Sequence, residues 1–202
     1  AIVGFSDLLS IETDPDLRET YISLIKSNNE LLLRLINDVL DISKIESGMV
    51  FFAYTDVYLP SAMRDMYNIM QLRMPENVEL ILDPCPDIMI RTDNNRMVQI
   101  LSNLLTNAIK HTSCGSIRFG YTLEGDHVHF YVSDTGKGIP EKELDHIFGR
   151  FVQLKGAYNG IGLGLAISKG LVNKMGGEIS VSSKVGEGST FRFTLPLANI
   201  LS

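Results

Sequence analysis

Apolar residues recur at helical spacing from residue 1 to about residue 46. Residues 1–10 are compatible with a helix, and Thr13-Asp14-Pro15-Asp16 interrupts the pattern. Asp14 or Thr13 can cap a second helix, predicted over 16–45, with proline in its first turn. A long apolar stripe runs along one side of this helix and contains Ile22, Ile25, Leu32, Ile36 and Val39. The stripe needs a partner, either in a hairpin packed on its own domain or in an intermolecular four-helix bundle, which the width of the stripe favours.

The pattern changes after Ser47-Gly48, where glycine predicts the end of the long helix. Shorter segments of strand and helix periodicity follow it, which indicates an α+β domain. The expected strands are 49–54, 78–82, 88–91, 116–123, 127–134, 178–183 and 189–195, and the expected helices are 61–73, 94–111, 140–151 and 163–175.

The helix predicted over 94–111 has an apolar half and a polar half. Asn103, Asn107, Lys110 and His111 cluster on the polar half at about 100° per residue. One interpretation is a solvated face that happens to carry two asparagines. The other is a binding row, because an asparagine oxygen can hold one position of a Mg²⁺ that keeps its waters and binds phosphates. Lys110 would add a charge for phosphate oxygens.

The strand predicted over 127–134 ends in Asp134-Thr135-Gly136-Lys137-Gly138-Ile139-Pro140. Strand alternation places Asp134 on the apolar side, where a carboxylate must find a partner. It can accept a hydrogen bond from an amine, and the glycines allow a flat ligand to approach the backbone. On the other side, His127 and His129 could ligate a metal, but no third ligand is evident nearby, and a solvated strand face is favoured.

A second glycine-rich stretch, Gly160-Ile161-Gly162-Leu163-Gly164-Leu165, precedes the helix predicted over 163–175. Glycines before a helix free backbone N–H groups for an anion, although a flexible hinge is the alternative. The spacing is not that of a Walker loop, and no strand precedes it as in a dinucleotide-binding turn. Residues 152–159 have little periodicity and are predicted to form a mobile loop.

Composition narrows the functional classes. The net charge of −6 disfavours a broad nucleic-acid surface, and the apolar content of 45% is ordinary for a globular protein. We find no signal peptide and no apolar run long enough to span a bilayer. Cys85 and Cys114 have no metal-ligand spacing and are interpreted as reduced, structural thiols.

Five short motifs occur in order, and together they resemble those of sensor histidine kinases of two-component systems. They are Asn103-x-x-x-Asn107-x-x-Lys110, Asp134-x-Gly136-x-Gly138, Phe148-x-x-Phe151, Gly160-x-Gly162-x-Gly164 and Gly186-x-Gly188-Ser189-Thr190-Phe191. Residues 1–46 also resemble the dimerisation hairpin of that family, truncated at its N-terminus. The resemblance implies that residues 47–202 form a catalytic ATP-binding domain, an α/β sandwich whose mixed sheet is covered on one face by helices.

The resemblance also implies roles for matching residues. Asp134 would bind the adenine amino group, Asn107 would hold Mg²⁺, and Asn103 and Lys110 would act beside the phosphates as catalytic residues. The glycine motif would anchor a movable lid over about 152–160. The other expected contacts to ATP are His111, Gly136, Gly138, Ile139, Phe151, Lys155, Tyr158, Gly160, Gly162, Leu163, Gly164, Leu165 and Thr190.

Two departures from related sequences carry information. The hydrolytic relatives (gyrase, chaperone and mismatch-repair ATPases) place a glutamate where Asn103 stands, and an amide cannot act as a general base. Asn103 therefore favours phosphoryl transfer over hydrolysis. The family's acceptor box, His-Glu/Asp-x-x-x-Pro, is not found around any histidine of this sequence. We expect the acceptor upstream of Ala1, and we expect the chain itself not to autophosphorylate.

The resemblance implies a homodimer formed through the hairpin and a response-regulator receiver domain, separate or fused, as the phosphoryl acceptor of the relay. It implies the cytoplasmic portion of a membrane-anchored sensor, with no nucleic-acid or membrane contact by these residues. A non-catalytic scaffold, a hydrolase and a serine/threonine kinase on the same fold are the alternatives. None of the motif glycines or asparagines is lost, which disfavours the scaffold.

Overall fold

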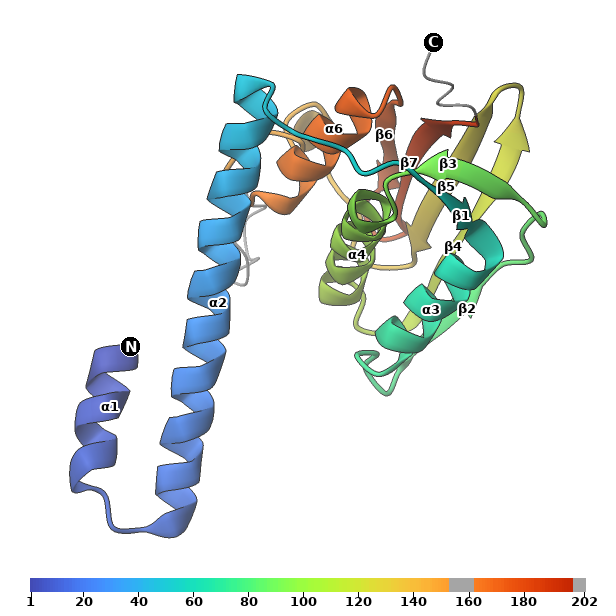
Figure 1. Cartoon of the computed structure of the whole chain (residues 1–202). Coiled ribbons are helices and arrows are strands. Elements are labelled where there is room, and N and C mark those ends of the chain that lie inside the picture. The colour runs from blue at the N-terminus through green and yellow to red at the C-terminus, as the bar shows by residue number, and fades with distance from the viewer. Residues whose placement is uncertain (153–161, 198–202) are drawn as a thin grey trace. The chain divides into compact units, whose positions relative to one another are not determined.

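A computed structural model describes residues 1–152 and 162–197 of the chain (Figure 1). The chain divides into two compact units, residues 1–43 and 44–202. In the described ranges, no helix combines the length and apolar character that a membrane span requires.

The first unit is a helical hairpin, as the sequence predicts. It contains α1 (Ile2–Ile11) and most of α2 (Pro15–Ser47). The Asp14 carboxylate caps α2 by accepting a hydrogen bond of 2.9 Å from the backbone N–H of Asp16. Arg18 closes the turn, because its Nη1 donates to the backbone oxygens of Leu9 and Glu12, at 2.9 and 2.8 Å.

The apolar stripe of α2 lies in solvent in the single chain. Neither α1 nor α2 has a buried residue. Leu32, Ile36 and Val39 of the predicted stripe are about half exposed to solvent, at 49%, 48% and 53%. A monomeric soluble protein rarely exposes a continuous apolar surface of this kind.

The segment after α2 corrects one sequence prediction. Gly48, with φ +71°, ends the helix as expected, but residues 49–54 do not form a strand. The backbone N–H of Ala53 donates to the Asp93 carboxylate at 2.9 Å, so a side chain takes the place of a strand partner. Pairing begins only at β1 (Thr55–Tyr58), which is antiparallel to β3 (Met89–Thr92).

The main sheet of the second unit has five strands in the order β2-β4-β5-β7-β6. The strands are β2 (Val78–Leu82), β4 (Gly115–Glu124), β5 (His127–Asp134), β6 (Ile179–Lys184) and β7 (Gly188–Pro196). The β2–β4 pair is parallel and the other pairs are antiparallel, which confirms the predicted mixed sheet.

Three helices cover one face of this sheet, as Figure 1 shows: α3 (Leu59–Gln71), α4 (Asn94–His111) and α6 (Gly164–Lys174). Strand alternation directs the core, since Val128, Phe130 and Val132 of β5 are fully buried. The Phe130 ring stacks on Phe193 of β7 at a centroid distance of 4.6 Å. The predicted α/β sandwich is therefore confirmed.

The helix predicted over 140–151 is shorter than expected. Helix α5 spans only Glu141–Leu144, and turns follow it. Phe151 has φ +58°, in the left-handed region, so the backbone there is not helical.

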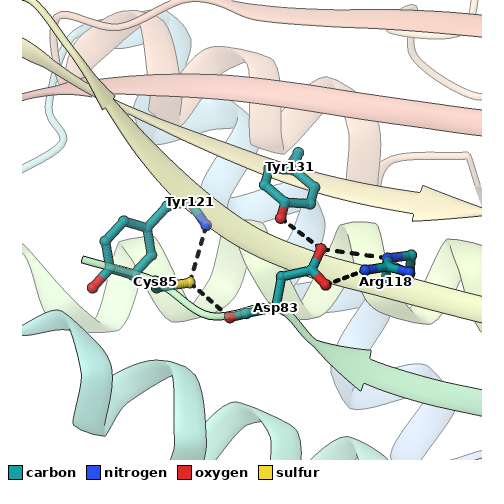
Figure 2. A network of polar contacts seen from close by, with 5 residues as sticks. All are labelled: Asp83, Cys85, Arg118, Tyr121 and Tyr131. Atoms are coloured by element: carbon teal, nitrogen blue, oxygen red, sulfur yellow. Dashed lines mark hydrogen bonds and ion pairs between the residues drawn. The ribbon is translucent and has the colours of Figure 1, made fainter. Parts of the chain in front are cut away.

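The uncovered face of the sheet carries a polar network beside strand β2 (Figure 2). The Asp83 carboxylate accepts hydrogen bonds from Tyr131 Oη at 2.7 Å and from Arg118 Nη2 at 2.5 Å. Cys85 Sγ donates to the Asp83 backbone oxygen at 3.1 Å and accepts from the Tyr121 N–H at 3.4 Å. The segment after β2 therefore remains attached to β4 after regular pairing ends.

Both cysteines are free thiols, as predicted. Cys85 is half-buried in this network, and burial raises the pKa of its thiol. Cys114 is exposed, so the prediction of a structural thiol fits only Cys85.

Candidate functional site

Asp134 ends β5 on the helix-covered face of the sheet, as strand alternation predicts. Asp134 is a buried polar residue, with only 7% of its surface exposed. The backbone N–H of Gly136 donates to Asp134 Oδ1 at 2.8 Å, so the loop folds back on the carboxylate. Burial raises the pKa of Asp134, and hydrogen bonds from the backbone N–H groups of Gly136 and Ser189 oppose this rise.

Strand register brings Ser189 beside Asp134, although the sequence predicted its neighbour Thr190 as the contact. Asp134 of β5 pairs with Ser189 of β7, and Ser189 is buried. Thr190, the predicted contact, is one residue further along and therefore points to the opposite face. Its hydroxyl lies 2.9 Å from that of Ser133 on that face. Of these two adjacent hydroxyl residues, Ser189 therefore shares the face of Asp134 and Thr190 does not. The sequence offers both residues side by side, and only the strand register distinguishes them.

The first residue of β7 approaches the Asp134 loop so closely that it admits no side chain. Gly188 has φ +110°, and a Cβ there would overlap the backbone oxygen of Asp134. Gly186, in the turn that precedes it, has φ +83° and open space around a Cβ. Close approach is therefore specific to Gly188, while both positions require a left-handed backbone.

We predict that Gly188→Ala lowers the free energy of unfolding by more than about 3 kcal/mol, because backbone strain and overlap add. The control, Gly186→Ala, carries the strain alone and is expected to lose about 1 kcal/mol. Urea unfolding of both variants measures the difference. Equal losses would contradict the overlap with Asp134.

The polar half of α4 faces the glycine-rich start of α6. Asn103 Nδ2 donates to the Gly164 backbone oxygen at 3.3 Å and to Ser168 Oγ at 3.4 Å. Ser168 is fully buried and was not predicted from the sequence. The amide nitrogen of Asn103 is thus engaged in holding α6, and its carbonyl oxygen is the atom available to a ligand.

Three basic groups gather where α4 meets the Asp134 loop. The backbone N–H of Lys137 donates to the His111 backbone oxygen at 3.3 Å. Burial, together with Lys137 and Lys110, lowers the pKa of His111 to about 4, so its imidazole is neutral at pH 7. Burial and Lys137 also lower the pKa of Lys110. The positive charges of Lys110 and Lys137 favour an anion nearby. Lys137 was not among the predicted contacts, although it lies within the Asp134 motif.

The two phenylalanines of the Phe148-x-x-Phe151 motif have different environments. Phe148 packs edge-on against Phe191 at 6.3 Å, and Lys169 Nζ lies 5.5 Å from the Phe148 ring centroid. Phe151 is 65% exposed, and its backbone N–H donates to the Gly162 oxygen at 2.9 Å. The motif therefore combines one half-buried ring with one exposed ring.

Some predicted contacts are available only through their backbone, and others are not described. Ile139 and Leu163 have buried side chains, at 8% and 1% exposed, so only main-chain groups could meet a ligand. Gly164 and Leu165 form the first turn of α6. Lys155, Tyr158 and Gly160 lie outside the described residues.

Asn107 is the candidate magnesium ligand. It is half-buried on the polar half of α4, and in residues 1–152 and 162–197 no hydrogen bond engages its side chain. A single amide oxygen fits an ion that retains waters and takes its other ligands from phosphates. No group of three or more His, Cys, Asp or Glu among the described residues could hold a metal by itself. His127 Nδ1 lies 2.6 Å from Oδ1 of the exposed Asp126, so this ring nitrogen contacts a neighbouring carboxylate at the surface.

Two family models match the chain. The model for histidine kinase-, DNA gyrase B- and HSP90-like ATPases matches residues 92–199, and the His Kinase A (phospho-acceptor) domain matches residues 1–48.

Curated relatives align along nearly the whole chain. The aerobic respiration control sensor protein ArcB of Escherichia coli is 38% identical over 206 residues, covering 96% of this chain and 26% of that protein. The hybrid signal transduction histidine kinase B of Dictyostelium discoideum is 35% identical over 207 residues, covering 96% of this chain and 10% of that protein. The chain therefore spans about a quarter or less of these relatives.

Two solved structures are similar. Full-length ShkA in complex with AMPPNP has a TM-score of 0.79 and 31% identity, covering 94% of this chain and 40% of that chain. The histidine kinase AdeS of Acinetobacter baumannii has a TM-score of 0.79 and 20% identity, covering 98% of this chain and 94% of that chain. The second likeness concerns the fold alone.

Proposed function

The chain belongs to the sensor histidine kinases, as a His Kinase A domain joined to their ATP-binding catalytic region, and we propose that it binds Mg-ATP and transfers the γ-phosphoryl group to a histidine. The observation that carries this proposal is the buried Asp134 carboxylate at the end of β5, beside the polar half of α4. The AMPPNP complex of ShkA supports it, since AMPPNP is an ATP analogue.

We assign adenine binding to the Asp134 loop. An ionised carboxylate can accept a hydrogen bond from the exocyclic amine of adenine. Guanine has a carbonyl oxygen at the corresponding position, and two acceptors do not bond. The buried position excludes competing water, which strengthens this discrimination. Neutral His111, at the end of α4, adds a flat surface for the base without adding charge.

We assign phosphate binding to the polar half of α4. Lys110 supplies a positive charge, and Lys137 adds a second one from the loop. Asn107 would hold Mg²⁺, which supplies charge stabilisation for the transferred phosphoryl group when bound. Asn103 contributes an amide oxygen and no general base, which favours transfer over hydrolysis.

We propose two functional domains. Residues 1–46 form the dimerisation hairpin, and residues 47–202 form the ATP-binding domain. The exposed stripe of α2 supports a homodimer, because a second copy would bury it in a four-helix bundle. We further propose that a response-regulator receiver, separate or fused, takes the phosphoryl group onward, and that these residues act on the cytoplasmic side of a membrane-anchored sensor.

The acceptor histidine is proposed to lie outside these 202 residues. His111, His127, His129 and His146 all belong to the second unit, and none has a following acidic residue and proline in the spacing of the acceptor box. His111 is also held neutral and half-buried at the end of α4.

Thermal unfolding tests the proposed function. At a hundredfold excess over its dissociation constant, Mg-ATP is expected to stabilise the chain by about 2.7 kcal/mol. For a protein of this size the Tm should rise by about 5–10 °C. Mg-GTP at the same concentration is the control and should give a much smaller shift. A Tm that Mg-ATP leaves unchanged would sink the proposal and favour a non-catalytic scaffold.

A further inference from the structure

Three polar side chains form one cross-strand row on the helix-covered face of the sheet. Asp134 of β5 pairs with Ser189 of β7, and Ser189 pairs with Ser183 of β6. Strand pairs directly opposite each other place their side chains on the same face. Ser183 is therefore linked to the proposed adenine site through the sheet, although it belongs to none of the sequence motifs.

The Ser183 hydroxyl has all of its hydrogen-bonding capacity in use. It accepts from the backbone N–H of Ile139 at 2.8 Å and donates to the Gly188 backbone oxygen at 2.8 Å. The Ser189 hydroxyl lies 3.0 Å away and can supply the third contact. A serine hydroxyl has one donor and two acceptor sites, so these three contacts satisfy it completely. One hydroxyl thus joins the Asp134 loop, the β6–β7 turn and the row.

Further contacts hold the same two segments together. The Gly186 N–H donates to the Lys137 backbone oxygen at 2.9 Å. At Gly138 a Cβ would overlap the backbone of Lys184, so the loop lies directly against the end of β6. The Ile139 N–H is different from these groups, because its partner is a side chain that a substitution can remove.

We propose that Ser183 is a positioning residue that sets the adenine loop, residues 135–139, against Asp134. The inference rests on the proposed function, in which this loop and Asp134 bind adenine. Ser183 acts through the Ile139 N–H and through Ser189, and not by touching phosphates. Its removal leaves the Ile139 N–H without its partner, so the loop relaxes away from the geometry that the base requires.

The effect should therefore be confined to the base. ADP and ATP share adenine and differ in phosphates, so Ser183→Ala should weaken both by the same factor, about tenfold. The discrimination between ATP and GTP should fall with it. Loss of a merely structural contact would lower the Tm without changing this discrimination.

The experiment measures ADP, ATP and GTP affinity and backbone amide hydrogen exchange at residues 135–139 in the 202-residue chain. In Ser183→Ala, the equal loss for ADP and ATP should accompany faster exchange at Ile139. Ser183→Thr keeps the hydroxyl and should restore both properties. Ser182→Ala is the matched control, since it removes a hydroxyl of the same strand that bonds Arg192 Nη1 at 2.9 Å on the other face.

Unchanged ADP affinity, or unchanged exchange at Ile139, in Ser183→Ala overturns the inference. If that variant does not fold, Ser183→Cys keeps nearly the same volume with weaker hydrogen bonding and must show a smaller, equal loss of affinity for ADP and ATP. Unchanged affinity in Ser183→Cys would also overturn the inference. A wild-type chain that binds no adenine nucleotide would remove the proposed function as well. A wild-type chain that binds ATP, with a variant that binds equally well, removes only the role of Ser183.

Discussion

Replacing Asp134 with asparagine is expected to lower the affinity for ADP and ATP by about 10- to 100-fold. A hydrogen bond to a charged acceptor contributes about 1.5–3 kcal/mol, and each 1.4 kcal/mol is tenfold in affinity. Asparagine can direct its own NH₂ group at the adenine amine, and two donors do not bond. Isothermal titration with ADP measures the loss.

The fold should survive this change. The amide oxygen of asparagine can still accept from the Gly136 N–H, the contact that holds the loop at 2.8 Å. Asp126→Asn is the matched control, because it removes the same charge from an exposed position at the other end of the β4–β5 hairpin. Unchanged ADP affinity in Asp134→Asn would remove the loop from the site.

The buried Asp134 carboxylate is also expected to make the free energy of unfolding depend on pH. Burial raises the pKa of Asp134 in the folded chain, so its ionised form is less favourable there than in the unfolded chain. This cost is present at neutral pH and disappears as the pH falls through the raised pKa towards the usual value. Asp134→Asn removes this cost, so the Tm of the variant at pH 7 should be no lower than that of wild type. Any excess of the variant's Tm over the wild-type Tm should shrink as the pH is lowered.

Replacing Asn107 with alanine is expected to lower the affinity for Mg-ATP by about 10- to 100-fold, the range typical for weakening a metal site. In EDTA the same substitution should leave ATP binding nearly unchanged, because only the amide oxygen proposed to hold Mg²⁺ is lost. The measurement is a pair of ATP titrations, with Mg²⁺ and with chelator.

Thr106→Ala is the control for this prediction, since Thr106 is the exposed preceding residue of α4. Equal losses with and without Mg²⁺ would assign Asn107 to nucleotide contact or to helix packing. No loss under either condition would remove Asn107 from the site and leave the asparagine row as a solvated face.

Local patterns predicted much of this molecule. The helix over 94–111 and the strand over 127–134 have the predicted bounds, because apolar periodicity acts over a few residues. The start of the helix is also set locally, since the Asp93 carboxylate caps it by accepting from the backbone N–H of Arg96 at 3.1 Å. The same alternation predicted that Asp134 faces the core. The change of period near Gly48 lies a few residues after the point where the structure divides into two units, which follows Ser43.

What the sequence by itself determined was which elements form and which face of each is polar. The tertiary structure decided which polar groups meet. The register of β7 on β5 selects Ser189 and excludes Thr190, and the register of β6 on β7 brings Ser183 beside it. The Asp93 carboxylate, 40 residues away in sequence, binds Ala53 where a strand was predicted. These contacts join distant segments, and strand register depends on the whole packed sheet, which no local period encodes.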